Sequence, residues 1–247
     1  MELSLFFKEY PEAAIAFSGG VDSAYLLYAA KKYAKRCCAY YVKTAFQPEF
    51  ELKDAIKLVK EIDAELKIIE ADILQFKEVT DNPGNRCYYC KKQIFDKIIS
   101  SAAEDGYKVI LDGTNASDDA DDRPGMKALA ELKVLSPLRI CGITKDEIRR
   151  LSREAGLFTA DKPAYACLAT RIPAGEVITA EKLSAIEKAE NFLFKEGFTD
   201  FRVRTVEGHA RIEVPDAQWM KLASSRDRIY EGLKGLFKTV SVSLKSR

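Results

Sequence analysis

The sequence lacks the features of membrane, secreted and nucleic-acid-binding proteins. It has no apolar run near the ~20 residues that cross a bilayer. Its beginning, MELSLFFKEYPE, lacks the basic flank and small-residue cleavage site of a signal peptide. The 39 Lys and Arg against 38 Asp and Glu leave a net charge of +1, which argues against broad electrostatic binding of nucleic acid. These absences predict a cytosolic protein that has neither a membrane nor a nucleic acid as its partner.

Histidine is nearly absent, whereas cysteine is not. The chain of 247 residues has one His, His209, and six Cys. In a cytosolic chain of this length the cysteines indicate metal or redox chemistry more than disulfides. A closed zinc site takes four ligands, so three cysteines would need His209 to complete one.

A short polar stretch between a strand and a helix is the most informative part of the chain. The apolar run 13–17 predicts a buried strand, and the apolar spacing within 24–34 predicts a helix. Between them lies SGGVDS, residues 18–23. A glycine-rich turn that opens a helix presents backbone N–H groups where an anion is favoured.

The residue types of this loop predict bound ATP and Mg²⁺. Gly19 and Gly20 lack a Cβ, so an anion can approach the backbone closely. Ser18 and Ser23 add hydroxyl donors. Asp22 would repel a bare phosphate, which predicts a Mg²⁺ ion bound together with the anion. The alternative is an ordinary strand-to-helix turn with an Asp/Ser cap.

The loop is neither of the two most familiar nucleotide motifs. It has no Walker Lys and no third glycine of the dinucleotide fingerprint. It resembles the PP-loop of ATP pyrophosphatases, which cleave ATP between the α- and β-phosphates and transfer AMP. The resemblance implies that ATP is bound by residues 18–23, Val21 included, and that Asp22 is catalytic.

Strands and helices alternate through the first two thirds of the chain. We expect strands at 37–42, 66–70 and 108–111, and helices at 50–62, 88–104 and 144–155. Helix 144–155 begins with a capping box, Thr144 and Glu147. The alternation predicts an α/β fold with a doubly wound parallel sheet, a PP-loop ATP pyrophosphatase domain at 1–165.

The strand and helix pattern after residue 165 predicts a smaller C-terminal α+β domain at 166–247. The family resemblance described below implies that this domain serves substrate binding and oligomerisation. Its expected elements are helix 180–196, strand 200–206, strand 209–214, helix 216–236 and strand 238–244. Glu207 and Gly208 mark the turn of a hairpin.

An acidic loop follows strand 108–111. It holds five carboxylates, of which most are expected to be solvated: Asp112, Asp118, Asp119, Asp121 and Asp122. The loop nevertheless sits at the carboxyl end of a strand, where open α/β sheets bind ligands. Gly113 and Thr114 are therefore candidate ATP contacts, as PP-loop enzymes carry a second Gly-Thr-like contact there.

Three cysteines form a candidate metal site. Cys87 and Cys90 are one helical turn apart, and Cys167 lies far along the chain. Three thiolates suit a [4Fe-4S] cluster with one iron open to an exogenous ligand, or zinc with His209; a redox disulfide between Cys87 and Cys90 is a further alternative. Cys37, Cys38 and Cys141 lie in apolar surroundings, which indicates core packing.

Several stretches together resemble the ATP-dependent sulfurtransferases of nickel-pincer nucleotide biosynthesis, the LarE family, which serves lactate racemase. The stretches are SGGVDS, TAFQPEFE, NRCYYCKK, LDGTN with SDD and RPG, the segment from Pro163 to Pro173, and FRVR with ARIEV. They span nearly the whole chain. The resemblance also implies a homo-oligomer, with a hexamer as the candidate form.

The resemblance implies that the carboxylates of pyridinium-3,5-biscarboxylic acid mononucleotide are adenylated and become thiocarboxylates. Simpler members surrender the sulfur of a cysteine at the position of Cys167. This chain adds Cys87 and Cys90, as cluster-using members do, which favours sulfide on a cluster over a sacrificial Cys167.

Four arginines are candidate contacts for the substrate phosphate and carboxylates, because guanidinium groups bind such anions bidentately: Arg171, Arg202, Arg204 and Arg211. Arg202 and Arg204 share one face of a strand. The alternative is a solvated basic face.

Three other functions fit part of the pattern. A tRNA-thiolation enzyme would share the loop and the cysteines, but the 14 basic and 11 acidic residues from Leu168 onward are too balanced for strong RNA binding. An amidating synthetase, for NAD or GMP, would have no use for three cysteines. A zinc-stabilised nucleotide-binding regulator would keep the loop without turnover.

Overall fold

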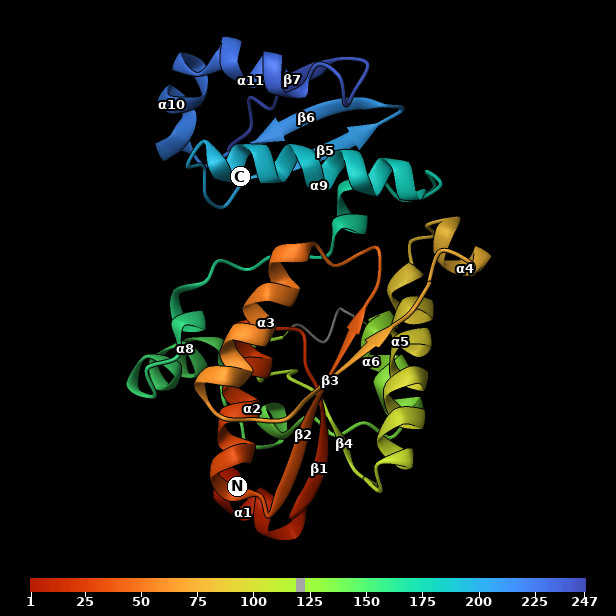
Figure 1. The fold of residues 1–247 in the computed structure, drawn as a ribbon, viewed down its shortest axis with the longest axis vertical. Coiled ribbons are helices and arrows are strands. Elements are labelled where there is room, and N and C mark those ends of the chain that lie inside the picture. The colour runs from red at the N-terminus through yellow and green to blue at the C-terminus, as the bar shows by residue number, and fades with distance from the viewer. Residues whose placement is uncertain (119–122) are drawn as a thin grey trace. The chain divides into compact units, whose positions relative to one another are not determined.

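The computed structural model describes residues 1–118 and 123–247 (Figure 1). It divides into two compact units. The first comprises Met1–Ile73 and Asn85–Lys162, and the second comprises Leu74–Gly84 and Pro163–Arg247. No helix of the described residues is long and apolar enough to cross a membrane. Three residues of the acidic loop, Asp119, Asp121 and Asp122, lie outside the described residues.

The first unit contains a four-stranded parallel sheet, which confirms the predicted doubly wound α/β fold. Its strands are β1 (Glu12–Ala16), β2 (Arg36–Lys43), β3 (Leu66–Glu70) and β4 (Ile110–Leu111). Their order is β3-β2-β1-β4. The chain moves away from β1 in one direction to β2 and β3, and then returns to its other side at β4. Open sheets bind ligands at such a switch point, outside the carboxyl ends of the strands.

Helices cover both faces of this sheet (Figure 1). The helical segments of the first unit are α1 (Leu3–Glu9), α2 (Val21–Tyr33), α3 (Glu49–Glu61), α5 (Arg86–Glu104), α6 (Arg123–Glu131), α7 (Pro137–Ile140), α8 (Lys145–Glu154) and the 3-10 turn η1 (Phe158–Asp161). Helices α2, α3 and α8 lie on one side, and α5 and α6 on the other. Thr144 caps α8 as predicted, since its side chain accepts a hydrogen bond from the Glu147 amide.

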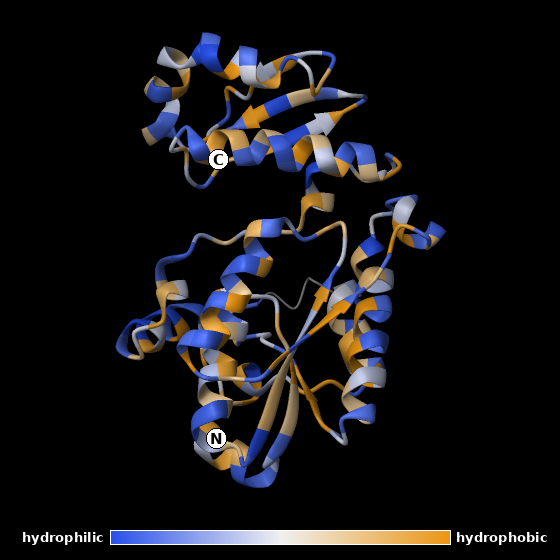
Figure 2. Cartoon of the chain, in the orientation of Figure 1, coloured by the Kyte–Doolittle hydropathy of each residue, from blue (hydrophilic) through white to orange (hydrophobic). Residues whose placement is uncertain are grey.

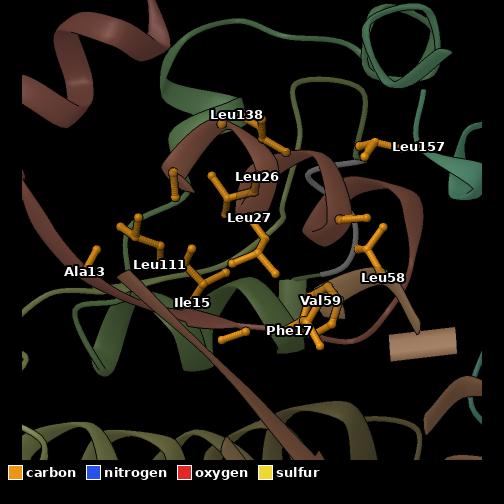
Figure 3. Packing of buried hydrophobic residues seen from close by; sticks show 14 of the residues in the cluster. Ala13, Ile15, Phe17, Leu26, Leu27, Leu58, Val59, Leu111, Leu138 and Leu157 are labelled. Carbon is orange, nitrogen blue, oxygen red and sulfur yellow. The ribbon is translucent and has the colours of Figure 1, made fainter. Parts of the chain in front are cut away.

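Strand β1 contributes to a core on each face. Ile15 packs in one buried cluster with Leu26 and Leu27 of α2 (Figure 3). Ala14 points the other way, into a cluster with Phe95 of α5. A fully buried Leu, Ile or Phe side chain stabilises the fold by about 1.5–3 kcal/mol. Figure 2 shows hydrophobic residues along the strands and mixed colouring on the helices, as two-sided burial of a parallel sheet requires.

The second unit is built on a three-stranded sheet of order β5-β6-β7. Its elements are α4 (Lys77–Thr80), the 3-10 turn η2 (Leu168–Arg171), α9 (Ala180–Lys195), β5 (Arg202–Val206), β6 (His209–Glu213), the 3-10 turn η3 (Asp216–Gln218), α10 (Trp219–Ser224), α11 (Arg226–Leu233) and β7 (Val240–Val242). Strands β5 and β6 form the predicted hairpin. Glu207 and Gly208 both have positive φ, 51° and 83°, as a tight two-residue turn requires.

One helix of the second unit is shorter than predicted. The expected helix 216–236 is divided into η3, α10 and α11, with Ser225 between the last two. The Ser224 hydroxyl donates to the Lys221 carbonyl, and such local bonds compete with helix propagation. Helix α6 is not among the helices predicted above, although Pro124 in its first turn is a favourable residue at a helix start.

Within the second unit, Asn82 binds the segment 74–84 to residues 172–176. The Asn82 side-chain amide donates to the carbonyls of Ile172, Pro173 and Glu176, at 3.3, 2.7 and 3.3 Å. The Asn82 carbonyl accepts from the Gly175 amide at 2.8 Å. A stretch that precedes the Cys87 helix is thereby ordered by the stretch that follows Cys167.

Candidate active site

The glycine-rich loop lies directly beyond β1 and opens α2. Gly19 has φ +76°, and a Cβ there would meet the Glu51 carbonyl at 3.3 Å, so a side chain is disfavoured by both backbone and space. Gly20 occupies the N-cap position of α2. The Ser18 and Ser23 hydroxyls are 3.1 Å apart, and Ser23 also donates to the Gly20 carbonyl. Serine side chains therefore hold the loop curled around the helix start.

A second loop, beyond β4, contacts the same helix start. A Cβ on Gly113 would lie 2.9 Å from the Ser23 amide nitrogen, so only glycine allows this approach. The Thr114 hydroxyl donates to Asp112, and the Ser136 hydroxyl donates to the same carboxylate at 2.6 Å. Asp112 is buried by these contacts and is thus not one of the solvated carboxylates of its loop. Gly113 and Thr114 are thus fixed beside the glycine-rich loop.

A cavity of about 340 Å³ opens between these two loops. Its polar end is lined by Ser18, Asp22, Ser23, Gly113 and Thr114, together with Asp118. Its apolar walls come from β2 and α5 and include Tyr40, Val42 and Phe95. The volume falls in the ~300–1,000 Å³ range of small-molecule sites. One polar end and one apolar end suit a ligand with a phosphate chain and an aromatic base.

Asp22 is held by an ammonium group and an amide. Lys145 at the start of α8 places its Nζ 2.5 Å from Asp22 Oδ2, and the Asn115 side chain donates to Oδ1 at 3.5 Å. Burial raises the pKa of Asp22 above the ordinary aspartate value of 3.8 and outweighs the opposing effect of Lys145. Carboxylate oxygens facing the cavity, with Asp118 nearby in its wall, are the ligand type that Mg²⁺ prefers.

Cys87 and Cys90 lie in the first turn of α5, Cys87 exposed and Cys90 buried. The positive end of a helix favours thiolates, and two soft donors one turn apart fit the chemistry of an iron–sulfur or zinc site. Within the described residues, no group of three or more His, Cys, Asp and Glu side chains is arranged to hold a metal ion.

Cys167 belongs to the second unit and caps the short turn η2. Its carbonyl accepts from the Thr170 amide at 3.0 Å, from the Thr170 hydroxyl at 2.8 Å and from Arg171 at 3.4 Å. The residue is half-buried. His209, the other ligand considered for a zinc site, is exposed on β6 and pairs with the Thr239 hydroxyl at 2.8 Å.

Three of the four candidate arginines contact the segment around Cys167, and the fourth, Arg211, lies beside one of them in the hairpin. Arg202 donates to the carbonyls of Phe201 and Ala164, at 2.6 and 2.7 Å. Arg204 pairs with Glu213 at 2.8 Å and donates to the Thr170 carbonyl. Arg211 stands opposite Arg204 in the hairpin and shares the same carboxylate. Arg171 differs, because its side chain is fully buried against Glu190.

Comparison with known proteins places this architecture in a family. The family model of queuosine biosynthesis protein QueC matches residues 12–82, which begin at β1 and include the glycine-rich loop. A pyridinium-3,5-bisthiocarboxylic acid mononucleotide synthase from Lactiplantibacillus plantarum is 30% identical over 240 residues, which cover 96% of this chain and 87% of that protein. The chain belongs to the LarE family of PP-loop proteins.

Other relatives are consistent with this assignment. An uncharacterised protein of Synechocystis sp. is 39% identical over 219 residues, 87% of this chain and 81% of that protein. A tRNA-specific 2-thiouridylase MnmA of a Thermotoga species is 27% identical over 232 residues, 76% of this chain and 61% of that protein. The LarE membership supports an ATP-using sulfur-transfer enzyme in general terms.

Two side chains of this LarE-family site were not predicted from its sequence. Lys145 was read as part of a helix start, yet it pairs with Asp22 across 123 residues of chain. Asn115 is fully buried beside Asp22 and had no distinguishing pattern around it. A lysine directly after a helix N-cap is unusual, because the positive end of a helix disfavours a cation unless a carboxylate is close.

The remaining cysteines of the LarE-family chain are packed in its cores. Cys38 is buried, and burial raises the pKa of its thiol to about 11. Burial also raises the pKa of Cys37 and of Cys141, which both pack against the cluster around β1 and α2. Thiols of this kind are poor nucleophiles and poor metal ligands. The predicted packing roles of these three residues agree with their surroundings.

Proposed function

We propose that this protein activates the carboxylates of pyridinium-3,5-biscarboxylic acid mononucleotide with ATP and converts them to thiocarboxylates. The observation that carries the proposal is that one LarE-family chain contains two kinds of site. One is a cavity between two phosphate-type loops with Asp22 at its polar end. The other is a cysteine segment bound by guanidinium groups.

In the first step, a substrate carboxylate oxygen attacks the α-phosphorus of ATP. The new P–O bond gives an acyl-adenylate, and the bond to pyrophosphate breaks. The amides of residues 18–23 would bind the departing phosphates at the start of α2. Asp22 would hold Mg²⁺, and Lys145, 2.5 Å from Asp22, would add a second positive charge at the same place.

In the second step, a sulfur nucleophile attacks the activated carbonyl carbon. The C–S bond forms, the C–O bond to AMP breaks, and AMP leaves with the electron pair. Adenylation is required because a free carboxylate is a poor electrophile. We propose that Cys87, Cys90 and Cys167 hold a [4Fe-4S] cluster, which would supply an iron that accepts sulfide.

Arginines of the second unit would recognise the anionic groups of the substrate. Arg202 is 6% exposed, and its guanidinium contacts two carbonyls but no carboxylate among the described residues. Burial, and after it the neighbouring Arg171 charge, lower the pKa of Arg202. A buried cation without a counter-ion is costly, so a phosphate or carboxylate of the substrate would find a favourable partner there. Arg204 and Arg211 would extend this site. Both pair with the single carboxylate of Glu213, so one of their two positive charges is left to attract a substrate anion.

Pyrophosphate release tests the proposal and separates it from tRNA thiolation. Anaerobic protein would be given ATP and Mg²⁺ with the pyridinium dicarboxylate mononucleotide, with tRNA, or with neither. We expect release stoichiometric with AMP only with the mononucleotide. Release that depends on tRNA would instead favour the function named for the MnmA relatives.

A further inference from the structure

The segment that carries Cys167 is held by a buried ion pair. Arg171 and Glu190 have side chains that are 0% and 2% exposed. Two parallel bonds join them, from Nε to Oε1 at 2.9 Å and from Nη2 to Oε2 at 3.1 Å. Glu190 projects from α9, and its Oε1 also accepts the Val203 amide of β5 at 2.9 Å. The carboxylate is thereby fixed by a helix and a strand at once.

The other side of the Arg171 guanidinium faces the cysteine segment. Nη1 donates to the Ala166 carbonyl at 2.8 Å, to the Thr170 hydroxyl at 2.9 Å and to the Cys167 carbonyl at 3.4 Å. The Tyr165 hydroxyl donates to the second oxygen of Glu190, and its ring lies 4.5 Å from the Arg171 guanidinium. The backbone on both sides of Cys167 is therefore held, through Arg171, by the carboxylate of Glu190.

Burying this ion pair is not an efficient way to stabilise a fold. The desolvation penalty of two charges often exceeds their attraction, and apolar replacements of similar volume are frequently as stable. A planar guanidinium does what an apolar side chain does not: it binds a carboxylate and several carbonyls at fixed angles. This geometry suits a role in orienting backbone more than a role in stability.

We propose that Arg171 and Glu190 are positioning residues, which fix the direction in which the Cys167 thiol leaves its segment. Arg171 then acts through Cys167 and does not contact substrate. The inference rests on the proposed function only for what Cys167 does; the rigidity of its segment can be measured without any substrate.

The test compares hydrogen exchange in residues 163–172 with sulfur transfer. In the double variant Arg171→Met with Glu190→Gln, both charges are removed, while the Gln oxygen can still accept the Val203 amide. Arg171→Lys keeps the charge but loses the fork and serves as the second variant. Leu222→Ala removes buried apolar volume from the same unit without touching the cysteine segment, so it is the matched control for lost stability.

We expect the Arg171 variants to exchange the amides of this segment about ten-fold faster than the unaltered protein. Thiocarboxylate formation should fall about 10–100-fold in kcat, with the KM for ATP unchanged. Leu222→Ala should lower the melting temperature but leave exchange in the segment and kcat unchanged. Wild-type exchange in both Arg171 variants, or equal acceleration by Leu222→Ala, would overturn the inference.

The two proposals can fail separately. If no protein forms thiocarboxylate, the proposed function is wrong, and exchange in the segment still decides whether the pair orders it. If exchange rises in the Arg171 variants but thiocarboxylate forms at the wild-type rate, the pair orders the segment without positioning the thiol, and the inference is wrong.

Discussion

Replacing Gly113 with alanine should damage the nucleotide site from a position that carries no reactive group. The new Cβ would meet the Ser23 amide nitrogen at 2.9 Å, the Ser23 Cα at 3.2 Å and the Asp22 carbonyl carbon at 3.3 Å. Carbon atoms pack best at about 3.5–4.0 Å, so the loop or the start of α2 must move by roughly 0.5 Å. The neighbouring atoms are all backbone, which leaves no flexible side chain to yield.

The magnitude follows from this displacement. Overpacking of this kind costs about 1–3 kcal/mol of folding free energy. A shift of up to ~1 Å in groups that position a reacting phosphate can cost about 100-fold in rate. We therefore expect Gly113→Ala to reduce kcat/KM for pyrophosphate release about 10–100-fold. The assay is pyrophosphate release at varied ATP, with thermal unfolding measured in parallel.

Gly235→Ala is the matched control, because a Cβ there meets nothing within 4 Å and φ is not positive. It should behave as the unaltered protein in both measurements. Unaltered pyrophosphate release in Gly113→Ala would refute the reasoning, since it would mean that the contact with the α2 start does not set the position of the loop.

Four further predictions concern Asp22, two arginines and the cysteines. Asp22→Asn should abolish AMP transfer in a folded protein; retained pyrophosphate release would contradict it. Because the pKa of Asp22 is raised in the folded protein, ionisation of Asp22 lowers the free energy of unfolding as the pH rises above 3.8. Chemical denaturation should therefore show that Asp22→Asn stabilises the protein more at pH 7 than at pH 3. Arg202→Ala and Arg204→Ala should raise the KM for the mononucleotide about ten-fold more than that for ATP; a rise confined to ATP would contradict the assignment. Alanine variants of Cys87, Cys90 or Cys167 should each lose iron in elemental analysis, and those of Cys37 and Cys141 should retain it.

The sequence predicted the sheet and the strand, turn and helix around the glycine-rich loop well because their signals are local. A strand, a glycine-rich turn and a helix follow one another within residues 12–33, and each leaves its own periodicity. Gly113 was singled out because the end of a parallel strand is where a ligand site forms, and it packs against the start of α2. These predictions need only neighbouring residues and the rules of parallel sheets.

The partners of the site residues depend on contacts across long stretches of chain. Lys145 and Asp22 are 123 residues apart. A lysine at the positive end of α8 indicates that a carboxylate is close, but the local sequence does not say which carboxylate it is. Arg171 was expected to bind substrate because guanidinium groups bind anions, but its anion is Glu190, 19 residues onward in α9. An arginine in the sequence thus indicates that an anion is bound, but it does not indicate which anion.

Intact-mass spectrometry during turnover tests the central claim most directly. Anaerobic protein would be incubated with ATP, Mg²⁺, the pyridinium dicarboxylate mononucleotide and excess sulfide. We predict several thiocarboxylates per chain, one AMP for each, and an unchanged protein mass. A single turnover in which Cys167 loses hydrogen sulfide and becomes dehydroalanine would contradict the account and assign the sulfur to the cysteine itself.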